Sequence, residues 1–104
     1  MNAIANKQVK RFQVGRQIVA TPNALESLRA NKQFAFTFIG RHAACDWSEC
    51  DSEDAKLNAQ SLIDGSRILS VYKLNDGSKI WLISDAENSD GVREALTLLL
   101  PCDY

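Results

Sequence analysis

Hydrophobic and polar residues along the first third of the chain alternate in patterns that predict a strand and then a helix. Residues 12–20 alternate and end in an apolar run, which predicts a short strand. Thr21 and Pro22 then predict a helix start, with threonine as the N-cap and proline in the first turn, where its missing N–H costs nothing. Leu25 and Leu28 are expected to share the buried face of this helix.

The apolar residues at 34–44 fit both the period of a strand and the period of a helix. Phe34, Phe36 and Phe38 alternate as they would in a strand. A helix would instead place Phe34, Phe38 and Ile39 in one apolar stripe. We favour the helix.

The clearest helical pattern follows at 52–64. Asp51 or Ser52 can cap its start, and Gly65 can end it. Its apolar residues recur at helical spacing and predict one buried face, made of Ala55, Ala59, Leu62 and Ile63.

A β-hairpin is predicted in the second half of the chain. Residues 68–74 and 79–84 are rich in β-branched and aromatic side chains, and the Asn-Asp-Gly sequence at 75–77 joins them. We expect a type I′ turn, because Asp-Gly tolerates the positive φ angles of that turn. An apolar run at 95–100, ended by Pro101, predicts a third strand beside the hairpin.

Together these elements predict an α+β domain, in which a small antiparallel sheet, made of the C-terminal hairpin and further strands, carries helices on one face. The 104 residues fit one domain. We expect it to span 12–104, after a flexible basic arm at 1–11. Both faces of the hairpin carry apolar residues, so a homodimer partner could cover the face that the helices leave open.

Composition excludes several classes of protein. The chain has 45% hydrophobic and 24% charged residues, as an ordinary globular protein does, which argues against disorder or a collagen. It contains no apolar run near the roughly 20 residues that cross a bilayer, and residues 1–20 lack the pattern of a signal peptide. We expect a cytoplasmic protein with no membrane contact.

Charge is distributed unevenly, although the net charge is only −1. Residues 1–43 carry seven basic residues and one acid, whereas residues 44–104 carry five basic residues and twelve acids. Five of these acids form a dense segment, namely Asp46, Glu49, Asp51, Glu53 and Asp54. They predict either a negative face for a basic partner or the acidic start of a helix, where carboxylates complement the helix dipole.

The N-terminal segment carries the opposite charge. Its cations could contact the phosphates of a nucleic acid, and they are Lys7, Lys10, Arg11 and Arg16. However, the pI of about 5.7 is far below that of a typical nucleic-acid-binding domain. Nucleic acid is therefore not the favoured partner.

Motifs for common cofactors and hydrolases are absent from the sequence. The five glycines are isolated, so there is no phosphate-binding glycine-rich loop, and neither H-E-x-x-H nor G-x-S-x-G occurs. Cys45 and Cys50 lie near His42 with roughly the spacing of zinc ligands, but no second pair completes four-coordination. We expect no cofactor and no metal.

The segment at 41–47 is the remaining candidate for chemistry. On a helix, His42 and Asp46 would face the same side, so the carboxylate could orient the imidazole, with Cys45 nearby as a nucleophile. Alternatively, His42 and Asp46 order the end of the helix while Trp47 packs into the core.

Several segments in their order resemble a family of small bacterial proteins found on plasmids and other mobile elements. The segments lie at 17–25, 41–47, 68–74 with 79–83, and 98–104, and the most distinctive is Arg-His-x-x-x-Asp-Trp at 41–47. Members are labelled plasmid-related or as type I restriction subunits, but the chain has no N-P-P-Y segment to support the second label. The family usually has glycine where this chain has Cys45 and Ser48, which argues against a shared thiol nucleophile.

We therefore expect a non-enzymatic interaction protein of a mobile element, which inhibits or regulates a host nucleic-acid-handling or defence system such as restriction or CRISPR. The expected binding residues combine the distinctive motif with the acidic segment, and they are Arg41, His42, Asp46, Trp47, Glu49, Asp51, Glu53 and Asp54. The alternatives are a small enzyme that uses His42 with Asp46, and a nucleic-acid-binding regulator that uses the basic arm.

Overall fold

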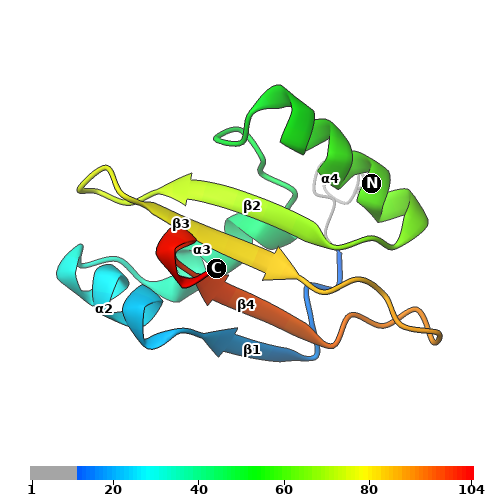
Figure 1. Ribbon diagram of the computed structural model, residues 1–104, viewed down its shortest axis with the longest axis horizontal. Coiled ribbons are helices and arrows are strands. Elements are labelled where there is room, and N and C mark those ends of the chain that lie inside the picture. Colours follow the sequence, from blue (N-terminus) through cyan, green and yellow to red (C-terminus); the bar gives the residue numbers. More distant parts are fainter. Residues whose placement is uncertain (1–11) are drawn as a thin grey trace, which may run out of the picture.

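A four-stranded mixed sheet organises residues 12–104, the part of the chain that the computed structural model describes (Figure 1). Its strands are β1 (Gln17–Ala20), β2 (Ile68–Lys73), β3 (Lys79–Ser84) and β4 (Ala95–Leu99). The spatial order is β1-β4-β3-β2. The predicted α+β class is confirmed, and so are the hairpin and the strand beside it. The predicted arm at 1–11, with Lys7, Lys10 and Arg11, lies outside the described residues.

One strand runs against the expectation of an antiparallel sheet. The pairs β2–β3 and β3–β4 are antiparallel, whereas β1 lies parallel to β4. The direction of β1 is set by a partner strand almost eighty residues further along the chain, with three helices in between, so no local sequence signal encodes it.

The described residues contain three α-helices, and local signals predict the beginning of two of them and the end of one. They are α2 (Pro22–Ala30), α3 (Ala35–Ala43) and α4 (Ser52–Asp64), and a short 3₁₀ helix, η1 (Pro101–Asp103), follows β4. The Thr21 hydroxyl accepts the Ala24 N–H at 3.1 Å, and the Asp51 carboxylate accepts the Asp54 N–H at 2.8 Å. Gly65 ends α4 with a φ of 81°. No helix within residues 12–104 is long and apolar enough to span a membrane.

The main core lies between the sheet and the helices α2 and α3, and Figure 1 shows α3 passing behind the strands. Its strand residues alternate along the chain, as the period of two requires. The buried core cluster consists of Ala24, Leu28, Phe38, Tyr72, Leu74, Ile80, Leu82, Leu96 and Leu98. The predicted pairing of Leu25 with Leu28 is wrong, because α2 turns Ala24 and Leu28 inward and leaves Leu25 53% exposed. In α3, the predicted stripe is only partly realised, since Phe34 is exposed.

Helix α4 buries a polar face, not the predicted apolar one. Its buried residues are Asn58 and Ser61, whereas Ile63 is 81% exposed. The reason is that α4 lies beside β2, one of the two edge strands of the sheet, whose backbone needs hydrogen-bond partners. The Asn58 side chain accepts the Leu69 N–H at 3.1 Å and donates to the Leu69 carbonyl at 2.7 Å. The amide thus replaces the missing neighbouring strand.

The hairpin turn differs from the predicted type. The Gly77 N–H donates to the Leu74 carbonyl at 2.9 Å, and the Leu74 N–H donates to the Ser78 carbonyl at 2.7 Å. Only Gly77, with a φ of 88°, has a positive φ in this loop, so the type I′ prediction is wrong. The loop is a three-residue connection that ends in a left-handed glycine.

Candidate functional site

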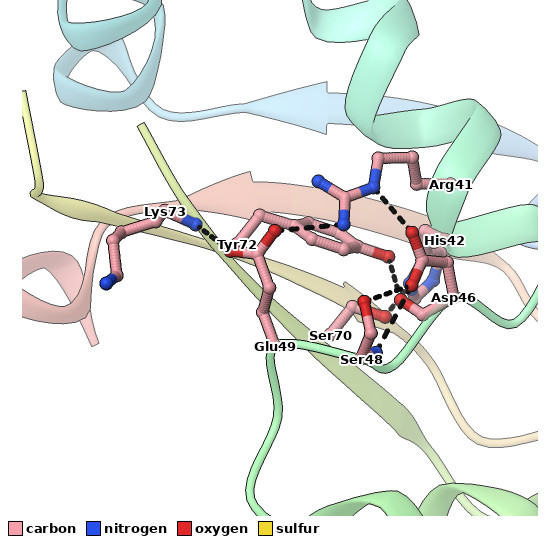
Figure 2. A network of polar contacts seen from close by, with 8 residues as sticks. All are labelled: Arg41, His42, Asp46, Ser48, Glu49, Ser70, Tyr72 and Lys73. Carbon is pink, nitrogen blue, oxygen red and sulfur yellow. Dashed lines mark hydrogen bonds and ion pairs between the residues drawn. The ribbon is translucent and has the colours of Figure 1, made fainter. Parts of the chain in front are cut away.

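Arg41 is the centre of a polar network at the end of α3 (Figure 2). Its Nε donates to Asp46 Oδ2 at 2.6 Å, and its Nη2 donates to Glu49 Oε2 at 2.9 Å. The guanidinium also lies 4.3 Å from the centre of the Tyr72 ring. One cation therefore holds two carboxylates of the acidic segment.

A turn of the backbone after α3 brings Asp46 back to the side chain of Arg41. Helix α3 ends at Ala43, and Cys45 follows in the left-handed region with a φ of 62°. The chain consequently turns back, and Asp46 can reach the guanidinium of Arg41. The left-handed conformation favours glycine, so a cysteine at position 45 adopts a backbone conformation that is costly for its side chain.

The two carboxylates of the network are ionised at neutral pH. Hydrogen bonds from Ser48, followed by the Arg41 guanidinium, hold the pKa of Asp46 below its usual value against the effect of burial. Burial also acts to raise the pKa of Glu49, but the Lys73 backbone N–H and Arg41 outweigh it, so this pKa is lowered too. The network therefore consists of one cation and two anions that shape the 46–49 segment.

His42 is completely buried and belongs to a different polar cluster. Its Nδ1 lies 2.6 Å from the Ser70 hydroxyl, and its Nε2 lies 2.8 Å from the Ser84 hydroxyl. Burial lowers the pKa of His42 to about 4, and the nearby Arg93 cation adds to this shift. The imidazole is thus neutral at pH 7, with both nitrogens occupied.

The predicted pairing of His42 with Asp46 is wrong. The helix ends before Asp46, so the two side chains do not lie on one helical face. Asp46 binds Arg41 and Ser48 instead. The structure gives His42 no exposed surface at which it could meet a substrate.

Trp47, the last residue of the distinctive motif, and the nearby Cys50 are both partly buried. Trp47 is half-buried, and its indole Nε1 has no hydrogen-bond partner among the described residues. The Cys50 thiol contacts the Leu69 carbonyl at 3.8 Å, and burial raises its pKa. Within residues 12–104, no three side chains of histidine, cysteine, aspartate or glutamate are arranged to hold a metal ion.

The acidic segment divides into two groups. Asp46 and Glu49 are held by Arg41, whereas Asp51 caps α4, and Glu53 and Asp54 occupy its first turn. Asp51 and Glu53 are exposed, Asp54 is half-buried, and none of the three forms an ion pair with a residue of the described chain. The acids therefore begin a helix, as one interpretation of the sequence predicts, and they leave negative charge at the surface. That this charge forms a face for a basic partner stays a prediction.

Arg16 is the described member of the basic N-terminal group. It lies just before β1 and pairs with Glu94 at 3.6 Å, with both side chains at least half exposed. It is thus partly neutralised, and it lies next to β1, whereas the acidic segment lies before and at the start of α4.

A groove on the second face of the sheet adjoins the acidic start of α4. It has a volume of about 550 Å³ and is lined by Glu49, Cys50, Asp51, Asp54, Val71, Lys79, Trp81 and Pro101. Val71 and Trp81 are directly opposite each other on β2 and β3, and they face away from the main core. We call this the open-face groove.

The C-terminus borders the same face. The Tyr104 ring lies 5.5 Å from the Trp81 ring, and Arg67 donates to the Tyr104 hydroxyl at 2.9 Å. Figure 1 shows η1 in front of the sheet, on the side opposite α3. The C-terminal residues thus cover part of the face for which the sequence suggested a dimer partner.

The sequence predicts the acids as binding residues and an apolar second face of the hairpin, but not that Val71 and Trp81 form the floor of a groove beside these acids. Val71 and Trp81 have the pattern of ordinary strand residues, and only the three-dimensional arrangement shows that they remain half-buried. The available signal was the apolar character of both hairpin faces.

Comparison of the chain with models of protein families, with curated proteins and with solved structures finds no match.

Proposed function

We propose that this chain is a non-enzymatic, cytoplasmic interaction protein of a mobile genetic element, and that it binds a basic host protein through the acidic start of α4. The partner class is a nucleic-acid-handling or defence system, such as restriction or CRISPR, which the protein inhibits or regulates. Proteins of this class carry basic surfaces for nucleic acid, and such surfaces attract clustered negative charge.

One observation carries the proposal. Asp51, Glu53 and Asp54 form no ion pair with a described residue, although Arg41 neutralises the neighbouring acids. These carboxylates lie at the surface, so a partner's cations can replace the water around them at a lower desolvation cost than for buried carboxylates. The mobile-element setting is supported by the Arg-His-x-x-x-Asp-Trp resemblance alone.

The geometry gives less support to the two alternatives. An enzyme built on His42 would need the imidazole to reach a substrate, and the ring is enclosed between Ser70 and Ser84. A nucleic-acid-binding arm would depend on Lys7, Lys10 and Arg11, which lie outside the described residues, with Arg16 bound to Glu94.

The test is capture of partners by the tagged protein from nuclease-treated lysate of a bacterial host. We expect a stoichiometric protein partner that is depleted when Glu53→Gln and Asp54→Asn are combined. The matched control combines Asp85→Asn with Asp90→Asn, which removes the same charge from exposed acids elsewhere. Recovery of nucleic acid alone, or equal recovery of the partner by both variants, would contradict the proposal.

A second readout addresses the inhibitory role. If the captured partner acts on nucleic acid, the purified wild-type protein is expected to lower that activity in proportion to the complex formed. The Glu53→Gln, Asp54→Asn variant should lower it less at equal concentration. Unchanged activity in the saturated complex would contradict inhibition.

A further inference from the structure

We infer that the open-face groove binds an extended segment of the partner in which a basic side chain stands next to an apolar one. This inference rests on the proposed function, because it names the part of the partner that meets the same acidic surface. It is carried by three features of the groove: an apolar floor, a wall of unneutralised acids, and an adjacent strand edge that is already occupied.

The floor is suited to apolar and planar groups. Val71 and Trp81 lie side by side across the hairpin, and both are half-buried rather than covered. Pro101 continues this surface towards the C-terminus. An aliphatic side chain would lose water against this floor, and a guanidinium could stack on the exposed part of the indole.

The acidic residues at the α4 side of the groove require a positively charged ligand group there. Asp51 and Asp54 line the α4 side of the groove, and they form no ion pair with a described residue. Glu49 also lines it, but its carboxylate already accepts from Arg41 and from the Lys73 N–H. The complementary ligand group at the α4 wall is therefore a cation.

The opposite end of the groove has the opposite charge. Lys79 lines the groove, and Lys73 and Lys79 line the hollow that adjoins it near the hairpin turn. A uniformly basic segment would meet repulsion there. The charges therefore favour a segment whose cations are confined to the α4 side and whose apolar residues cross the floor.

The segment cannot bind by adding a strand to β2. The Asn58 side chain bonds both the N–H and the carbonyl of Leu69, and the Glu49 carboxylate accepts the Lys73 N–H at 2.7 Å. These contacts occupy backbone groups that an added strand would need. Recognition must therefore come from side chains on the face of the sheet. A volume of about 550 Å³ accommodates a few side chains of an extended segment.

The test uses the full chain labelled with ¹⁵N, and the probe is a capped hexapeptide with two arginines at one end and leucines at the other. We expect the peptide to shift the Trp81 indole signal and the backbone amides of Asp54 and Val71. The Trp47 indole, which does not line the groove, serves as the internal reference. A peptide with glutamate in place of arginine should produce no such shifts.

Two charge variants test how the charges of the groove change the affinity for the peptide. Asp51→Asn combined with Asp54→Asn should weaken peptide binding by about fivefold or more, and asparagine at position 51 preserves the helix cap. Lys79→Glu should strengthen binding by a similar factor, because it removes repulsion and adds a carboxylate. The Asp85→Asn, Asp90→Asn control should bind as the wild type does.

Equal binding of the glutamate peptide, or shifts that spare Trp81, would overturn the inference. The captured host partner separates this failure from failure of the proposed function. If capture depends on Glu53 and Asp54 but is unchanged by Val71→Ser and by Trp81→Ser, the groove inference is wrong and the proposed function stands. If capture is unchanged by Glu53→Gln with Asp54→Asn, the proposed function itself is wrong.

Discussion

His42 illustrates how its surroundings decide the role of a single side chain. A neutral imidazole has one donor and one acceptor, and the hydroxyls of Ser70 and Ser84 can rotate to satisfy both. A charged imidazole would lose its hydration without gaining an anion, so burial favours the neutral form. The sequence shows the chain's one histidine but not the two serines that come from β2 and β3.

This environment makes stability depend on pH. The pKa of His42 is lowered from 6.5 to about 4 in the folded protein, so between these values the unfolded state binds a proton that the folded state does not. Stability is therefore complete above pH 6.5 and falls as the pH drops towards 4, by on the order of 3 kcal/mol. Urea unfolding at several pH values between 7 and 4 measures this loss.

The control for this prediction is His42→Ala. The chain has no other histidine, so the variant should lose the slope between pH 7 and 5. At pH 7 it should also be less stable, by about 1–3 kcal/mol for each buried hydroxyl left without a partner. A variant that keeps the wild-type slope would show that His42 is not the titrating group.

At the scale of single elements, the features with local signals were predictable and those set by neighbours were not. Thr21, Asp51 and Gly65 mark helix ends through contacts within one turn, and each lies where its signal predicts. The buried face of α4 was wrongly predicted, because it is chosen by the backbone of β2 and not by the apolar residues of the helix. Asn58 faces inward for that reason.

Asn58→Ala should be costly for a surface helix. The variant leaves the Leu69 N–H and carbonyl without their partner, at about 1–3 kcal/mol for each group that remains buried. It also frees the outer edge of β2 for pairing with another chain. We expect lower stability in urea together with concentration-dependent association in sedimentation. Lys56→Ala, at an exposed position of the same helix, should show neither effect.

The hairpin contains an unfavourable pair that a single substitution can improve. Lys73 and Lys79 are directly opposite each other on β2 and β3, so two like charges meet across the strands. Lys79→Glu replaces repulsion with attraction and should stabilise the protein by about 0.2–1 kcal/mol. Thermal unfolding at low salt measures the gain, and a lower melting temperature would contradict the cross-strand argument.

At the scale of the whole molecule, the two faces of the sheet have different roles. One face is sealed by α2 and α3 over a continuous apolar core. The other is only partly covered by the C-terminal residues, and it leaves Val71 and Trp81 beside the acids of α4. The second face brings together strand residues of the hairpin, the start of α4 and the C-terminal residues, which are separate in the sequence. The acids were therefore predictable as candidates, whereas the groove that they border was not.

The central claim is that charge at the start of α4 recognises a basic partner. The most direct test is the affinity for the captured partner, measured over a series of salt concentrations for the wild type and for the Glu53→Gln, Asp54→Asn variant. Screening weakens attraction between surface charges, so we predict that wild-type affinity falls as salt rises and that the variant shows a weaker dependence. Affinity that is independent of salt and equal in the two proteins would contradict the claim.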